Sequence, residues 1–418
     1  MVRNTIFSDK LDSRQYVVLW SLFFLFVILS RSFNCLFWNP VYGGWITNIM
    51  SMLLFAWFFL KCKVDRKMHL NRIVKMLMLL PFFSVINSWI LYDQSPVEGI
   101  KATMSNFSIW GVYFILHRYK VKEVVVLKFF LLVAVLMAAI QIIQQFTYPN
   151  AIFGVTPPDD VLENGIMEVA ENRNGLWRFR MNCDGFYTMP ILLMVWLQLK
   201  RHITLNRLLL VSVLLLSIYF TLTRQVMASA LLAIFMSFFI GQKKINVKYL
   251  LFGLVCIIGL YVYYDELFGQ LAEQASDEAN DDNIRILAAE YYWNDSFRTP
   301  FTFLFGFGNA VSGAFLHYVE SLTQIKHFFV TDVGAIGCIW RYGFVYTITV
   351  YYMLYKLFFR LKNIIPLYIR LMVVFAFPMS IMIFPAIVSY QYLVWACLLY
   401  ICDLHISRSS LIMNIPKS

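Results

Sequence analysis

The chain has 418 residues, of which 60% are hydrophobic and only 14% are charged, and its formal net charge is +11. Soluble domains contain about 25% charged residues, whereas apolar runs here approach the ~20 residues that a helix needs to cross a bilayer. The composition therefore excludes an ordinary soluble protein and predicts an all-α polytopic membrane protein. Because the basic residues lie mainly in short connectors between apolar runs, the positive charge indicates topology and not a nucleic-acid partner.

Length and flanking charge predict about twelve transmembrane helices, with both chain termini in the cytoplasm. The first apolar run is too long for a cleavable signal sequence and lacks a small-residue cleavage site. The tenth span exceeds what a bilayer needs, so we expect it to tilt or to begin as a partly buried outer helix. The expected spans are 16–30, 45–60, one ending at Tyr92, one returning to His117, 124–146, 186–199, 208–220, 226–240, 249–263, 333–359, 366–384 and 390–404.

Two long polar segments of this single membrane domain are expected on the extracytoplasmic side. The first, 147–185, contains three arginines and no lysine. The second, 264–332, precedes the tenth span and begins with an acidic run that is typical of a solvated surface. Ile284, Leu287, Ala288 and Tyr291 or Tyr292 then follow helical spacing, which predicts an amphipathic helix over 284–293 capped by Asn283 or Asp282. Arg298-Thr299-Pro300 is expected to end this helix, and glycines 306, 308 and 313 to form a tight loop.

Arginine predominates among the cations expected outside, and arginine holds phosphate oxygens bidentately while keeping its charge in a partly dry site. Arg224 lies in a very short connector between two spans, where an unsolvated charge is costly. Arg285 lies in the first helical turn of the second loop, beside backbone amides that can bind an anion. The alternatives are that these arginines extend to the membrane surface or pair with carboxylates, as Arg285 could with Asp281 or Asp282. The further candidate binding residues are Arg173, Arg178, Arg180, Arg298, His327 and Arg341.

Asp332 stands where the second loop re-enters the membrane, just before Val333-Gly334-Ala335-Ile336-Gly337. A transfer to a hydroxyl group needs one base beside the acceptor, and a carboxylate near arginines can serve. The alternative for Asp332 is a helix cap for the tenth span. His317 and His327 follow the same logic, with a plain loop position as their alternative.

Nucleotide and metal chemistry are not indicated by the remaining motifs. The chain has no P-loop, and Gly306-Phe307-Gly308 lacks the third glycine and the strand-turn-helix setting of a dinucleotide site. Its seven cysteines occur without a Cys-x-x-Cys pair, which predicts neither a zinc site nor a disulfide framework. We therefore expect no cofactor and no metal.

The order of these features resembles the superfamily of O-antigen polymerases and O-antigen ligases, which are bacterial envelope glycan enzymes. The shared features are the Thr221-Leu222-Thr223-Arg224 step between two helices and a large outer loop with an arginine-led helix, a proline and Gly-x-Gly. A polar residue then precedes a glycine-rich span that ends at Arg341-Tyr342-Gly343. The resemblance covers 221–343 by motif and the whole chain by topology. It implies that Arg224 and Arg285 hold the diphosphate of an undecaprenyl-linked glycan, which is transferred without nucleotide or metal.

One departure from the superfamily bears on the reaction. Ligases usually carry a His-Asn pair where this chain has Asp332-Val333, and the difference favours a polymerase. The expected activity is thus a membrane glycosyltransferase that polymerises lipid-linked repeat units of O-antigen, capsule or exopolysaccharide in the bacterial inner membrane. Arg224 and Arg285 would stabilise the diphosphate and Asp332 would act as the base.

Two alternatives stay open at this stage. The chain could be an O-antigen ligase that transfers glycan to the lipid A core of lipopolysaccharide, or a non-enzymatic flippase. Transporters place binding groups at mid-membrane, whereas this sequence has few charges within its spans. The partners expected for the polymerase are the lipid-linked glycan, the lipid bilayer and a protein that regulates chain length.

Overall fold

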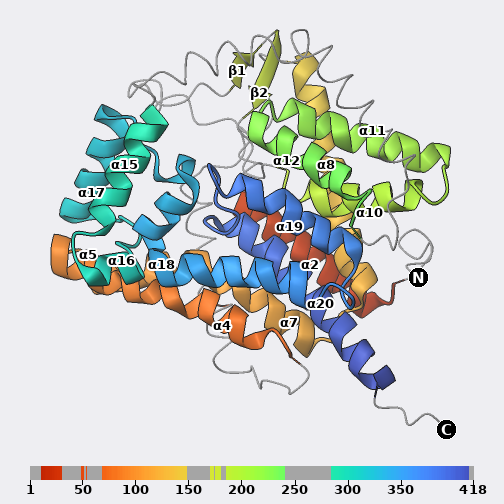
Figure 1. Cartoon of the computed structure of the whole chain (residues 1–418), viewed down its shortest axis with the longest axis horizontal. Coiled ribbons are helices and arrows are strands. Elements are labelled where there is room, and N and C mark those ends of the chain that lie inside the picture. The colour runs from red at the N-terminus through yellow and green to blue at the C-terminus, as the bar shows by residue number, and fades with distance from the viewer. Residues whose placement is uncertain are drawn as a thin grey trace.

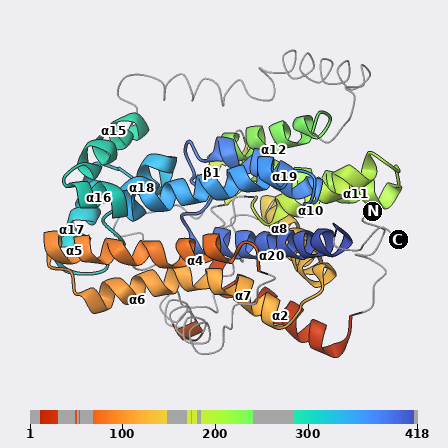
Figure 2. The same ribbon diagram turned by 60° about the horizontal axis from the view of Figure 1, so that its bottom comes forward.

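The computed structural model describes residues 11–30, 49–50, 53, 68–147, 170–173, 175–179, 185–240 and 284–413. These residues are mostly helical, which confirms the all-α prediction at this level. The one sheet within the described ranges is a two-stranded antiparallel ribbon, in which Glu171 pairs with Arg178. Figures 1 and 2 show α15, α16 and α17 at one end of the molecule and α10, α11 and α12 at the other, with α18 and α19 between them.

The elements of the first half of the chain are α2 (Ser13–Ser30), α4 (Asn71–Leu79), η1 (Leu80–Phe83), α5 (Ser84–Tyr92), α6 (Pro96–Phe107), η2 (Ser108–Gly111), α7 (Val112–Arg118), α8 (Glu123–Thr147), β1 (Ala170–Arg173), β2 (Leu176–Phe179), α10 (Thr188–Leu199) and α11 (Leu205–Phe220). Those of the second half are α12 (Arg224–Met236), α15 (Ile284–Ser296), α16 (Pro300–Phe305), α17 (Gly313–Glu320), η3 (Ser321–Ile325), η4 (Val330–Asp332), α18 (Gly334–Tyr355), η5 (Lys356–Arg360), α19 (Leu367–Met379) and α20 (Ser389–Met413). Residues 306–312 connect α16 to α17 without helix or strand, which confirms the loop predicted at glycines 306, 308 and 313. Short helices lie on both sides of this loop.

Two helical stretches of the described chain are long and apolar enough, by length and composition, to cross a membrane. They are 71–92, formed by α4, η1 and α5, and α8. Five shorter apolar helices, α2, α10, α11, α12 and α19, accompany them. The expected spans at 45–60 and 249–263 lie outside the described residues, apart from helical residues at 49–50 and 53. Twelve spans and their orientation therefore stay a prediction.

Helix α18 is broken in its first half, which explains why the expected tenth span looked too long. Gly343 has φ 87° and ψ 164°, so the helix direction changes there. The carbonyls of Trp340 and Arg341 would accept bonds from residues four positions later in a straight helix. Here they accept bonds from the amides of Phe307 (2.8 Å) and Gly308 (2.7 Å) instead. We call this arrangement of 304–309 against 340–343 the clasp.

The clasp depends on two glycines that face each other's backbone. A β-carbon added to Gly306 would overlap the backbone at Arg341, and one added to Gly343 would overlap the carbonyl of Leu304. Both glycines also have positive φ, which side chains disfavour. Asn87 of α5 fixes the segment from the other side, because its Nδ2 donates to the Gly306 carbonyl at 2.6 Å. Gly306-Phe307-Gly308 therefore has a structural role, because its amides bind the carbonyls that precede the break in α18.

The molecule has two hydrophobic cores of different character. The larger core runs through the bundle formed by α2, α4, α7, α8, α10 to α12, the second half of α18, α19 and α20. The smaller core, here called the aromatic cluster, lies beneath α15, α16 and α17 and includes the first half of α18. Its buried members are Ala288, Tyr292, Phe307, Phe315, Leu322, Val333 and Trp340.

Candidate functional site

The start of α12 is built by a tight turn that places Arg224 in the first helical position. Leu222 has φ 46°, a strained value for a non-glycine residue, and its side chain is buried. The hydroxyls of Thr221 and Thr223 donate to the carbonyls of Ile218 (2.8 Å) and Thr221 (3.1 Å). The sequence Thr-Leu-Thr-Arg thus folds as a compact reversal between α11 and α12, with the arginine at a helix N-terminus.

A second arginine from the ribbon comes to the same place. Arg178 of β2 donates from Nη2 to the hydroxyl of Thr223 at 3.3 Å. Gln145 of α8 holds the ribbon there, since it accepts from the Trp177 amide at 2.9 Å and donates to the Trp177 carbonyl. We call Arg178 and Arg224 the arginine pair. Two guanidinium groups beside the amino end of a helix favour an anion, because the helix dipole adds to their charge.

The turn at 378–382, which includes the last two residues of α19, joins the start of α12 to the start of α18. Gln225 donates from Nε2 to the carbonyls of Pro378 (2.9 Å) and Met379 (3.0 Å). On its other side, the amides of Gly334 and Ala335 donate to the carbonyls of Met382 (2.8 Å) and Ser380 (2.9 Å). We call 378–382 the junction turn. It places the residue after Arg224 and the residues after Asp332 on the same short segment.

Asp332 is the last residue of η4 and its side chain is exposed. The hydroxyl of Thr331 donates to its carboxylate at 3.2 Å. The helix-cap alternative for Asp332 is wrong, because Val333 occupies the cap position of α18 and no side chain caps that helix. The carboxylate therefore faces outward at the entrance to α18.

Arg285 lies in the first turn of α15 with a partly exposed side chain, while its expected caps and carboxylate partners at 281–283 lie outside the described residues. The predicted apolar face of this helix is confirmed in part: Ala288 and Tyr292 are buried, together with Ser296, whereas Ile284 and Leu287 are exposed. Because α15 packs on α18 and η4, Arg285 belongs to the end of the molecule that also carries Asp332. Helix α15 ends at Ser296, as expected from Arg298-Thr299-Pro300, and Thr299 then starts α16 through a capping box with Thr302.

Arg298 is engaged by a carboxylate. Its Nη2 lies 2.7 Å from Oδ1 of Asp295, and its Nη1 donates to the Tyr92 hydroxyl at 2.9 Å. Oδ2 of Asp295 accepts from Trp340 (2.8 Å) and Tyr318 (3.1 Å). Burial alone would lower the pKa of Arg298, but Asp295 and Tyr92 raise it, so its pKa lies above the ordinary value. These contacts make Arg298 a structural member of the aromatic cluster.

The structure describes all but one of the remaining predicted residues. Arg341 donates from Nε to Oδ1 of Asn309 at 2.8 Å. His327 is exposed with φ 55°, and His317 lies on α17 with its Nδ1 3.3 Å from Oε2 of Glu320. Arg173 is the last residue of β1, whereas Arg180 lies outside the described residues.

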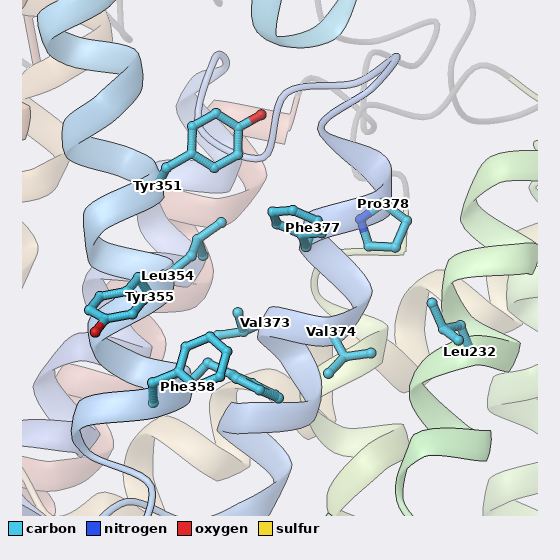
Figure 3. A pocket seen from close by; sticks show the side chains of 10 residues that line it. Leu232, Tyr351, Leu354, Tyr355, Phe358, Val373, Val374, Phe377 and Pro378 are labelled. Atoms are coloured by element: carbon cyan, nitrogen blue, oxygen red, sulfur yellow. The ribbon is translucent and has the colours of Figure 1, made fainter.

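An apolar groove opens beside the junction turn, between α12, α18, η5 and α19 (Figure 3). Its volume is about 520 Å³, which is within the range of about 300–1,000 Å³ typical of small-molecule sites. Tyr351, at one end, donates its hydroxyl to Ser380 of the junction turn at 3.0 Å. The lining residues are Leu232, Tyr351, Leu354, Tyr355, Phe358, Phe359, Val373, Val374, Phe377 and Pro378.

The sequence interpretation missed this groove because its residues resemble any others in a membrane span. One signal was available, since Tyr351, Tyr355, Phe358 and Phe359 repeat on one helical face. Large rings at that spacing form a continuous wall, and Tyr355 and Phe359 remain 49% and 57% exposed. Exposed aromatic rings in such a row indicate a surface that accepts apolar material.

No group of three or more His, Cys, Asp or Glu side chains in the described ranges is arranged to hold a metal ion. Neither a protein-family model, nor a curated protein, nor a solved structure matches the chain. What the site can do chemically therefore follows from the arginine pair, the junction turn, Asp332 and the groove.

Proposed function

We propose that this chain is a bacterial inner-membrane glycosyltransferase that polymerises undecaprenyl-diphosphate-linked oligosaccharide repeat units at the outer face of the cytoplasmic membrane. The observation that carries the proposal is the connection between the arginine pair and the apolar groove. Gln225, next to Arg224, is bonded to the carbonyl of Pro378, and Pro378 is also a wall of the groove. A cationic site and a hydrocarbon site thus share one segment of chain.

A ligand that fits both sites must be an amphiphile with an anionic head. The lining of the groove is almost entirely carbon, so the groove favours hydrocarbon. The arginine pair, at the amino end of α12, favours phosphate oxygens. A polyisoprenyl diphosphate has both parts, because its diphosphate is attached directly to its hydrocarbon chain. Because the groove opens between helices that we expect to span the bilayer, its hydrocarbon chain would enter from the lipid.

The reaction that suits these groups is glycosyl transfer. An acceptor hydroxyl oxygen attacks the anomeric carbon of the donor glycan, and the bond from that carbon to the phosphate oxygen breaks. The diphosphate leaves with the electron pair, and Arg178 and Arg224 stabilise its added negative charge. The hydroxyl proton passes to the carboxylate of Asp332, which is exposed at the entrance to α18.

The central test uses purified protein in liposomes with a lipid-linked repeat unit, and the products are resolved by length on gels. Wild-type protein should lengthen the lipid-linked glycan. Arg224→Ala and Arg178→Ala should each reduce the rate by about a hundredfold, the effect of removing one group that stabilises a developing oxyanion. Arg201→Ala is the matched control, because this exposed arginine lies in the turn after α10 and should leave the rate unchanged.

Each other result has a defined meaning. Wild-type rates in both arginine variants would contradict the site. Transfer of glycan to lipid A core without lengthening would identify a ligase, and transbilayer movement without new bonds would identify a transporter.

The groove can be tested separately from the arginines. Val374→Trp places a large ring into the groove and should raise KM for an undecaprenyl-linked substrate about tenfold, but leave KM for a geranyl-linked analogue nearly unchanged. Leu209→Trp, at an exposed position of α11, is the matched control. An equal effect of Val374→Trp on both substrates would show that the groove does not hold the lipid chain.

A further inference from the structure

Arg341, which belongs to the clasp, differs from Arg298 because its hydrogen-bond partner is a neutral side chain. Its Nε donates to Oδ1 of Asn309 at 2.8 Å, and its guanidinium carbon lies 5.4 Å from the ring centre of Tyr342. Within the described chain, no carboxylate lies within ion-pair distance of Arg341. The side chain is only partly exposed. A partly buried guanidinium is expensive without a counter-charge, and such a group is a candidate for binding an anion.

Asn309 holds this arginine in a fixed orientation. Its Oδ1 accepts from both Arg341 and the Tyr342 hydroxyl (3.1 Å), so the acceptor is fully used. The residue is only 6% exposed, and its buried Nδ2 has no hydrogen-bond partner among the described residues. Buried amide groups without a partner are rare, because each costs part of its hydration energy. A guanidinium without a counter-charge thus lies next to a buried amide nitrogen without an acceptor.

The main chain around Asn309 is also built to stay in place. Gln94 is 1% exposed and follows α5. It donates from Nε2 to the Asn309 carbonyl (3.0 Å) and accepts from the Val311 amide (2.9 Å). The clasp fixes Gly308, the residue before Asn309, by its bond to the Arg341 carbonyl. Orientation of Arg341 by a rigid neutral partner leaves its two terminal nitrogens for a ligand.

Arg341 lies on the Asp332 side of the molecule. Tyr292 of α15 contacts Trp340, the residue before Arg341, with 5.0 Å between the ring centres, and α15 also packs on η4, which ends at Asp332. Arg341 and Asp332 thus both belong to segments that pack on α15. The arginine pair lies across the junction turn, at the start of α12. An anion at Arg341 would thus be separate from the leaving diphosphate and near the base.

We propose that Arg341, positioned by Asn309, is a binding subsite for an oxyanion of the acceptor glycan. This inference rests on the proposed function, because the term acceptor assumes glycosyl transfer. The oxyanion is either the carboxylate of an acidic sugar or a phosphate of a second lipid-linked glycan. Both chemistries present oxygen atoms that a guanidinium binds with two parallel hydrogen bonds.

The test is a binding measurement by calorimetry on the full chain in detergent, with two soluble probes and no turnover. The probes are a uronic-acid disaccharide and inorganic pyrophosphate, and Arg224→Ala serves as the background so that the arginine pair contributes little. Asn309→Asp keeps the shape of the side chain but gives Arg341 a carboxylate partner. It should weaken binding of one probe at least tenfold, and Arg341→Gln should do the same. Asn294→Asp adds the same charge at an exposed position of α15 and is the matched control.

The probe that loses affinity identifies the source of the oxyanion. Loss for the disaccharide assigns a sugar carboxylate, and loss for pyrophosphate assigns a phosphate. Unchanged affinity for both probes in Asn309→Asp and Arg341→Gln would overturn the subsite, as would a parent protein that binds neither probe. Failure of glycan lengthening in liposomes would instead refute the proposed function, since the calorimetry needs no reaction. If Asn309→Asp does not fold, Arg341→Gln decides the result alone.

Discussion

Arg298 shares the carboxylate of Asp295 with Trp340, and Arg341 follows Trp340 in the chain, yet the two arginines have opposite kinds of partner. Arg298 contacts Asp295, whose carboxylate is 11% exposed and also accepts from Trp340 and Tyr318. Arg341 contacts the neutral amide of Asn309. An arginine paired with a carboxylate has a structural role, whereas one paired with a neutral amide is a candidate for binding a ligand. The expected location of both on the outer side does not make this distinction.

The rings around the two arginines support the same distinction. The guanidinium carbon of Arg298 lies within 6 Å of three ring centres, those of Tyr92 (5.5 Å), Phe307 (5.4 Å) and Tyr318 (5.8 Å). Cation–π contacts of this kind add to its ion pair and leave little reason for a further anion. Among the described residues, Arg341 has one such ring, that of Tyr342.

The largest loss of stability is expected from a change that disrupts the clasp. Gly343→Ala would place a β-carbon against the Leu304 carbonyl, at a backbone φ of 87° that alanine disfavours. Strain and overlap together should cost at least about 4 kcal/mol and lower the thermal unfolding midpoint strongly. Gly313→Ala is the control: Gly313 has φ 62° but no neighbouring atom within 4 Å, so its cost should stay near ~1 kcal/mol. Equal losses in the two variants would show that the backbone contact is unimportant.

A smaller effect is expected when the counter-charge of Arg298 is removed. In Asp295→Asn the ion pair is lost, and an amide cannot replace a carboxylate that accepts from Arg298, Trp340 and Tyr318. Hydrogen bonds to a charged group contribute about 1.5–3 kcal/mol, and partial exposure of Arg298 reduces this, so we expect a loss of about 2 kcal/mol in unfolding free energy. Glu290→Gln, at an exposed site of the same helix, should change stability by less than ~0.5 kcal/mol. An Asp295→Asn protein as stable as the control would remove the contrast between the two arginines.

Sequence patterns located the helices and several of their ends because these are decided locally. The expected third span ends at Tyr92, as α5 does, and Arg224 begins α12 after a Thr-Leu-Thr turn. Spacing also predicted the helix that begins at Ile284 and the burial of Ala288. It could not show that Ile284 and Leu287 are exposed, because their burial depends on how α15 packs on α18.

The pairings that define the site could not be predicted from the sequence. Asp295 reaches Trp340 and Gln94 reaches Asn309 across long stretches of chain, and no local rule selects such partners. Gly343 looked like one of several small residues in a span, and its positive φ depends on the approach of Leu304. The groove likewise forms from three helices that are separate in sequence.

Gln94 offers a change that acts on the Arg341 side alone. Gln94→Met would leave the Asn309 carbonyl and the Val311 amide without their buried partners, at a cost of about 1–2 kcal/mol. Because Asn309 would lose its fixed position, the KM for the acceptor should rise several-fold while the KM for the donor stays the same. Steady-state kinetics with each substrate varied in turn would measure this. A rise in the donor KM alone would mean that Gln94 supports a different site.

The smallest effect is expected for an ion pair on the exposed surface of the same end of the molecule. His317 lies 3.3 Å from Glu320 one helical turn later, and the two side chains are 80% and 43% exposed. Water and salt screen such a pair, so His317→Ala should change unfolding free energy by less than ~0.5 kcal/mol and leave glycan lengthening unchanged. Thermal unfolding and the liposome assay would measure both. Asp295→Asn measured beside it shows how far burial changes the value of a charge: a large loss in His317→Ala would mean that exposure does not distinguish the two pairs, and that pairing in this region follows another rule.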